Sequence, residues 1–123
     1  MSDKVHAVGL AVGDLTRSVA FYTQVFGLTQ YETYDLPHMR EILLGYAGDQ
    51  FRVVLMQYTD GERRDPRVVG NKLVFEVRDA FAIADRLREA GAEITREPSA
   101  IGGFAAVAFA LDPDGHTLEL LQR

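Results

Sequence analysis

Residues 8–28 read VGLAVGDLTRSVAFYTQVFGL, a strand pattern followed directly by a helix pattern. At the start, bulky and small residues alternate with the period of two that is typical of a half-buried strand, which we expect over residues 5–12. Asp14 is suited to cap the next element, because its carboxylate can accept hydrogen bonds from the free N–H groups of a first helical turn. Gly27 is a good residue to end a helix. The stretch therefore predicts a helix over residues 15–26.

The same succession of patterns returns in the second half of the chain, at a constant offset that takes Asp14 to Asp79. Residues 72–77, KLVFEV, alternate as a half-buried strand does, Asp79 follows as a cap, and residues 80–90 form a second helix pattern. The ends of the two halves keep this offset, because residues 53–57 align with residues 118–122. An offset that holds at several points indicates an internal duplication.

Each half carries further strand patterns after its helix. In the first half they cover residues 41–45 and 51–58, and in the second half residues 105–111 and 117–121, separated by the turn sequence DPDG of residues 112–115. Each half therefore predicts the order strand, helix, strand, strand, strand. The bulky strand positions should pack under the helices. The fold class we expect is α+β, with two tandem βαβββ modules that form a curved mixed sheet with an open cup.

The length and composition of the chain fit one domain. It has 123 residues, 47% hydrophobic and 25% charged, which are ordinary values for a globular domain with its own core. We expect a single domain over residues 1–123, with a first module at about residues 4–58 and a second at about residues 71–123. The segment between them, residues 59–70, is polar and rich in turn residues, and we expect it to be a linker.

The composition also excludes several classes of function. Without cysteine the chain cannot hold cysteine-ligated zinc or an iron–sulfur cluster, nor use a thiol as nucleophile. A net charge of −5 and an isoelectric point near 5.1 argue against nucleic acid as a partner. No apolar run approaches the roughly 20 residues that span a bilayer, and the start lacks the pattern of a secretory signal. We expect a cytoplasmic protein with neither a nucleic-acid nor a membrane partner.

The opening motif of residues 8–28, the sequence DPDGHTLEL of residues 112–120 and the paired βαβββ pattern together resemble the vicinal oxygen chelate superfamily. That superfamily includes glyoxalase I, extradiol dioxygenases, fosfomycin-resistance thiol transferases, methylmalonyl-CoA epimerases and bleomycin-resistance proteins. The resemblance covers essentially the whole chain and is specific for the superfamily, not for one activity. It also implies a homodimer, because members usually close or complete the cup with a second copy.

In enzymes of this superfamily, His and Glu side chains hold a divalent metal, one on each of four strands. The resemblance places these positions at Ala7, Val54, Lys72 and Glu119, and the internal offset relates the first to the third and the second to the fourth. Only Glu119 matches the usual ligand types, because Ala7 and Val54 have no donor atom and an ammonium group repels a cation. One carboxylate does not make a site for a hard metal ion. We therefore expect no metal and no other cofactor.

The three histidines are not expected to replace the missing ligands. His6 neighbours Ala7 in the first strand, so the alternation of side chains points it to the opposite face. His116 lies an odd number of residues before Glu119, which has the same effect in a regular strand, and we interpret it as structural. For His38, in a loop, both a substrate contact and a solvated side chain remain open.

Lys72 and Glu119 are the candidates for catalysis. They can form a mutual ion pair, or Lys72 can anchor an anionic or carbonyl group while Glu119 acts as a base. If the pair is buried, removal of one partner should cost about 3–5 kcal/mol. The residues that we expect to line the ligand site are Ala7, Val54, Met56, Tyr58, Lys72, Val74, Glu76, Glu119 and Leu121.

Two classes of function remain open. The first is a metal-independent protein that binds a small, partly apolar molecule, as in the bleomycin-resistance branch. The second is an enzyme, either a glyoxalase-type lyase or isomerase or another member that acts on a small carbonyl or aromatic metabolite. The acidic net charge and the missing metal ligands favour the first class.

Overall fold

A computed structural model describes residues 6–61 and 72–123. The chain divides into two compact units, Met1–Arg64 and Asp65–Arg123. The division falls within the predicted linker, most of which lies outside the described residues. That both units belong to one domain stays a prediction.

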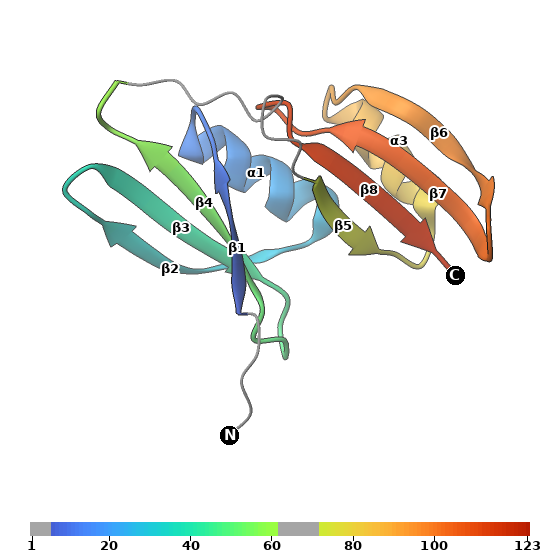
Figure 1. Cartoon of the computed structure of the whole chain (residues 1–123), viewed down its shortest axis with the longest axis horizontal. Coiled ribbons are helices and arrows are strands. Elements are labelled where there is room, and N and C mark those ends of the chain that lie inside the picture. The colour runs from blue at the N-terminus through green and yellow to red at the C-terminus, as the bar shows by residue number, and fades with distance from the viewer. Residues whose placement is uncertain (1–5, 62–71) are drawn as a thin grey trace. The chain divides into compact units, whose positions relative to one another are not determined.

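The first unit is a four-stranded sheet with one helix along one side (Figure 1). Its strands have the order β1-β4-β3-β2, in which β1 and β4 run parallel and the other pairs antiparallel. The elements of the first unit are β1 (Ala7–Ala11), α1 (Leu15–Phe26), β2 (Thr29–Asp35), β3 (Met39–Gly45) and β4 (Arg52–Tyr58).

The second unit repeats this arrangement, with the strand order β5-β8-β7-β6 and a parallel pair β5–β8. Every element begins at the same offset from its counterpart in the first unit, the offset that the sequence predicts. Two mixed sheets with a helix each make the fold class α+β, as predicted, whereas a single cup lined by both sheets stays a prediction. The elements of the second unit are β5 (Lys72–Glu76), α3 (Ala80–Glu89), β6 (Ile94–Ile101), β7 (Phe104–Leu111) and β8 (Thr117–Gln122).

Two strands, β2 and β6, were not located by the sequence patterns. All residues of β2 are exposed, and of the eight residues of β6 only two are partly covered. Both are edge strands, so neither has the alternation of buried and exposed residues on which the prediction depends. Pro98 within β6 further weakens its strand pattern.

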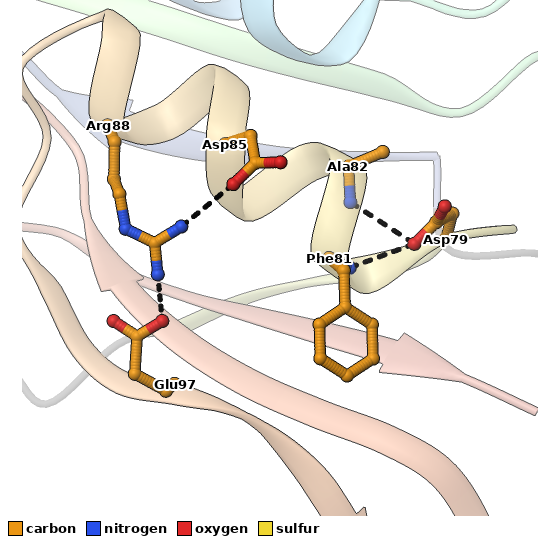
Figure 2. A network of polar contacts seen from close by, with 6 residues as sticks. All are labelled: Asp79, Phe81, Ala82, Asp85, Arg88 and Glu97. Atoms are coloured by element: carbon orange, nitrogen blue, oxygen red, sulfur yellow. Dashed lines mark hydrogen bonds and ion pairs between the residues drawn. The ribbon is translucent and has the colours of Figure 1, made fainter.

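The caps of both helices are as predicted. The Asp14 carboxylate accepts a hydrogen bond from the backbone N–H of Arg17 at 3.2 Å. The Asp79 carboxylate accepts two, from Phe81 at 3.0 Å and Ala82 at 3.1 Å (Figure 2). The two acids therefore satisfy N–H groups that the first helical turn leaves free.

A glutamine near the end of each unit's last strand supports the same helix starts. Gln57 Oε1 accepts from the backbone N–H of Leu15 at 3.0 Å, and Gln122 Oε1 accepts from that of Ala80 at 2.8 Å. These bonds join the start of each helix to the last strand of its unit, which pairs in parallel with the first. They fix the helix along one side of the sheet.

The core of each unit lies between its helix and the facing side of its sheet. Tyr22 in α1 and Leu87 in α3 have no exposed surface, and neither have Leu55 in β4 and Leu118 in β8. In the second unit the strand β7 contributes only small buried residues on this side: Ala106, Ala108 and Ala110. The bulky positions therefore pack under the helices as predicted, and small residues in β7 leave room for α3.

Helix α3 is also tied to the edge strand β6 by charge. Arg88 pairs with Asp85 in the helix at 2.9 Å and with Glu97 in β6 (Figure 2). All three side chains are largely exposed, so this network orients the edge strand and adds little to stability. No helix among the described residues has the length and apolar character needed to cross a membrane.

Replacing Gln122 with methionine should destabilise the second unit by about 1–2 kcal/mol, because the Ala80 N–H loses its acceptor in a partly buried place. Urea unfolding followed by circular dichroism measures the change. Gln24→Met, at an exposed position of α1, is the matched control and should change the unfolding free energy by less than about 0.5 kcal/mol. Equal stability of the two variants would show that the glutamine bond is not needed.

Candidate functional site

The second sheet has one side toward α3 and one side without a helix. In β8, Leu118 and Leu120 are buried against the helix, whereas the residues that alternate with them are partly exposed. We call the side without a helix the open face of the second sheet. It is lined by Lys72, Val74, Glu76, Thr117, Glu119, Leu121 and, from β7, Phe109.

Lys72 and Glu119 form an ion pair on this open face. The Lys72 Nζ lies 3.0 Å from the Glu119 Oε2. In the parallel register Glu119 is paired with Val74 on one side, and in the antiparallel register with Phe109 on the other, so apolar neighbours flank the carboxylate. The structure confirms the interpretation of Lys72 and Glu119 as a mutual pair.

The pair is less buried than the sequence suggested. The Glu119 side chain is only 14% exposed, but the Lys72 side chain is 52% exposed. Water therefore screens the attraction and can solvate the ammonium group if the pair opens. The cost of about 3–5 kcal/mol for breaking a buried pair does not apply here. The ammonium group can therefore turn toward a ligand.

Glu76, predicted as a ligand residue, is held by an arginine that the prediction did not include. The Arg123 Nε donates to the Glu76 Oε1 at 2.7 Å, and its guanidinium carbon lies 5.5 Å from the centre of the Phe104 ring. Arg123 follows β8 with the same alternation as Glu119, and this spacing is the signal that could have placed it on the open face. Both members of the pair are largely exposed.

The first sheet has a corresponding open face, on the side away from α1. Ala7 is paired with Arg52, Gly9 with Val54 and Ala11 with Met56, so the predicted ligand residues of this unit share one side of their sheet. The predicted residues on this face are Ala7, Val54, Met56 and Tyr58, all of them partly exposed.

Gly9 provides space for one of these side chains. A Cβ atom at Gly9 would lie 3.0 Å from the Met56 Cε, so the methionine packs over the glycine. Two charged residues on the same face were missed by the prediction: Arg52, beside Ala7, and Glu41 of β3, beside Met56. The alternation of Arg52 with the buried Val53 and Leu55 of β4 is the signal that could have found it, whereas no such alternation marks Glu41 in β3.

The histidines lie away from both open faces or in loops. His116 is buried, with 4% of its surface exposed, and its backbone N–H donates to the Asp112 Oδ1 at 2.8 Å. The same oxygen accepts from the N–H of Asp114, so His116 belongs to the turn between β7 and β8, in line with the structural interpretation. His6 is exposed before β1, and His38 is exposed in the turn between β2 and β3.

The residues at the four metal positions implied by the family do not fit a divalent metal ion. Ala7 and Val54 offer no donor atom, and the carboxylate of Glu119 is already paired with the Lys72 ammonium group. Within residues 6–61 and 72–123, no three His, Asp or Glu side chains gather where they could hold a metal. The chemistry of these open faces has to be derived from the chain's own residues.

Comparison with known proteins identifies the family. The model of the Glyoxalase/Bleomycin resistance protein/Dioxygenase superfamily matches residues 4–120. This chain belongs to that superfamily.

Its curated relatives include lactoylglutathione lyases from bacteria and plants. The chain is 35% identical over 118 residues to the lactoylglutathione lyase of Salmonella typhimurium, covering 92% of this chain and 87% of the relative. It is 34% identical over 117 residues to the lactoylglutathione lyase GLX1 of Arabidopsis thaliana, covering 91% of this chain and 41% of the relative. These names favour a glyoxalase-type function over bleomycin resistance.

Solved structures agree with this relationship. Glyoxalase I from Zea mays matches with a TM-score of 0.82 and 31% identity, over 96% of this chain and 44% of the maize chain. The trypanothione-dependent glyoxalase I of Leishmania major matches with a TM-score of 0.81 and 26% identity, over 98% of this chain and 87% of that chain. This chain thus spans less than half the length of the plant proteins that it matches.

The Lys72–Glu119 pair should contribute only about 0.3–1 kcal/mol of coupling energy, because half of the lysine side chain faces water. A double-mutant cycle of Lys72→Met, Glu119→Leu and both together, measured by urea unfolding, gives this energy. We expect Lys72→Met to be the more harmful single change, because it leaves a largely covered carboxylate without its partner.

The exposed pair Arg40–Asp35 is the control for this cycle, and its coupling should be close to zero. A coupling of about 3–5 kcal/mol between Lys72 and Glu119 would mean that the pair is fully buried. A coupling of zero, equal to the control, would mean that the pair does not form in solution.

Proposed function

We propose that this chain is a glyoxalase-type enzyme that moves a proton within a small carbonyl substrate, as an isomerase or lyase does. The observation that carries the proposal is the Lys72–Glu119 pair, 3.0 Å apart on the open face of the second sheet. The pair occupies two of the positions at which the family resemblance places metal ligands. The names of the relatives, lactoylglutathione lyases, support the reaction class.

In the proposed mechanism, Glu119 is the base. Its carboxylate takes a proton from the carbon next to the substrate carbonyl, and the electron pair of that C–H bond moves toward the carbonyl oxygen. In a substrate with a hydroxyl group on the carbon that loses the proton, the proton returns to the former carbonyl carbon while the hydroxyl proton passes to the former carbonyl oxygen, so the isomerisation consumes no oxidant or reductant. The apolar neighbours Val74 and Phe109 keep water away from much of the carboxylate.

Lys72 is proposed to stabilise the negative charge on the substrate oxygen. An ammonium group aimed at the oxygen that gains charge lowers the barrier most where water is partly excluded. Because the Lys72 side chain is half exposed, its Nζ can leave Glu119 and donate to this oxygen. The carboxylate is released for proton transfer by the same movement.

The surroundings of the pair suit a substrate with an apolar part. Val74 is an apolar residue that is 44% exposed, and Leu121 lies beyond it on the same face. Burial of such a side chain against a ligand contributes to binding without directing the reaction. Lactoylglutathione, after which the relatives are named, is the first compound to test.

A second function is binding of a small molecule without turnover. The missing donors at Ala7 and Val54 favour it, because these residues cannot support metal-based chemistry. The two functions are distinguished by whether lactoylglutathione is consumed or only bound.

Glu119→Gln should lower the rate of lactoylglutathione conversion by about 100-fold or more, because the amide keeps the shape of the carboxylate but cannot take a proton. Mass spectrometry of the products measures the rate. Glu89→Gln, at an exposed position of α3, is the matched control and should keep the wild-type rate.

Full activity of Glu119→Gln would exclude Glu119 as the base. Binding of lactoylglutathione by the wild-type protein without any conversion would favour the second function. If the wild-type protein neither binds nor converts lactoylglutathione, this compound is excluded as the ligand.

A further inference from the structure

We propose that Arg52 binds a carboxylate group of the ligand on the open face of the first sheet. The proposal rests on the proposed function in that it takes the protein to bind a small molecule. All groups that form this site belong to the first unit, and none of them takes part in the proton transfer assigned to Lys72 and Glu119.

The position of Arg52 depends on a glycine in the neighbouring strand. Arg52 begins β4, where it is paired with Ala7 of β1, and Gly45 ends β3 on the other side. A Cβ atom at Gly45 would lie 2.6 Å from the Arg52 Nη1 and 3.2 Å from its Cδ. Only a residue without a side chain therefore lets the arginine lie across β3 toward β2.

The guanidinium group is held in place at the end of this path. Its central carbon lies 4.0 Å from the centre of the Tyr31 ring in β2, a cation–π contact. The Nη1 donates to two backbone carbonyl groups of the loop before β4, that of Asp49 at 2.7 Å and that of Phe51 at 3.2 Å. These contacts use one face and one nitrogen of the group.

Among the described residues of the first unit, no acid balances the charge of Arg52. Within the described residues, no carboxylate pairs with Arg52: that of Asp49 accepts the backbone N–H of Phe51, and that of Asp35 pairs with Arg40. By contrast, Arg40, Arg88 and Arg123 each pair with a carboxylate of the chain.

What remains on Arg52 is the edge formed by its Nε and Nη2, for which the described residues provide no acceptor. Two parallel N–H groups of this kind match the two oxygens of a carboxylate. Because Tyr31 and the loop carbonyls already fix the side chain, little rotational freedom is lost when an anion binds.

The direct test is a titration of the wild-type protein followed by nuclear magnetic resonance of the arginine Nε–H groups. Benzoate is the carboxylate probe and benzamide its neutral counterpart. The Arg52 signal, assigned by its loss in Arg52→Lys, should shift with benzoate until it saturates and should stay in place with benzamide. The Arg40 signal, from an arginine already paired with Asp35, is the internal control and should show no saturation.

Three results would contradict either the Arg52 proposal or the proposed function. A small, non-saturating shift of Arg52 equal to that of Arg40 would overturn the proposal and leave a structural clamp. Saturation by inorganic phosphate but not by benzoate would overturn the assignment of a carboxylate. The titration uses the wild-type protein and needs no turnover. If the Arg52 signal saturates with benzoate but lactoylglutathione is not converted, the result therefore counts against the proposed function alone.

A second measurement extends the test to the proposed ligand. Arg52→Gln should weaken the binding of lactoylglutathione by about tenfold or more, since a charged hydrogen bond is lost, and should leave the binding of its diethyl ester unchanged. Arg52→Lys keeps the charge but not the two parallel N–H groups, so its affinity for lactoylglutathione should lie between those of the wild-type protein and Arg52→Gln. Equal weakening for acid and ester would indicate a structural effect and overturn the proposal.

Discussion

The parallel pairing of the first and last strands in each unit is the constraint on which the other features depend. Parallel neighbours cannot be joined by a tight turn, so the chain between them has to cross over, and here it does so through a helix and two further strands. The helix then covers one side of the sheet, and a glutamine of the last strand holds its start. The opposite side is left open along the parallel pair, and this is where Lys72 and Glu119 meet.

Much of this arrangement could be predicted from the sequence, because the caps and the alternation are local. Asp14 and Asp79 mark both helix starts, and the offset between them holds for the start of every element. The edge strands β2 and β6 could not be located, since they bury nothing that a pattern would show. The constant offset also does not hold for the pairing of the third strand of each unit with the fourth. Val54 is paired with Leu43, whereas its counterpart Glu119 is paired with Phe109, one residue after the counterpart of Leu43.

This shift by one residue adds to the difference in charge between the two open faces, most of which comes from Ala7, Ala11 and Val54 standing where the second sheet has Lys72, Glu76 and Glu119. It places Glu41 on the open face of the first sheet, whereas its counterpart at the constant offset, Ala106, is buried under α3. For the candidate site, the family resemblance, together with the internal offset, was sufficient to place Lys72 and Glu119 near one another. The exposure of Lys72, the Glu76–Arg123 pair and the path of Arg52 over Gly45 depend on side-chain packing and required the structure.

We propose that the Lys72–Glu119 pair takes the place of the metal ion that the family resemblance implies. Metal analysis by inductively coupled plasma mass spectrometry, after the purified protein has been incubated with Zn²⁺ or Ni²⁺ and dialysed, tests it most directly. We expect far less than one metal ion per chain, because Ala7, Val54 and Lys72 offer no ligand for it. A metal content near one per chain that is lost in Glu119→Ala would contradict the claim.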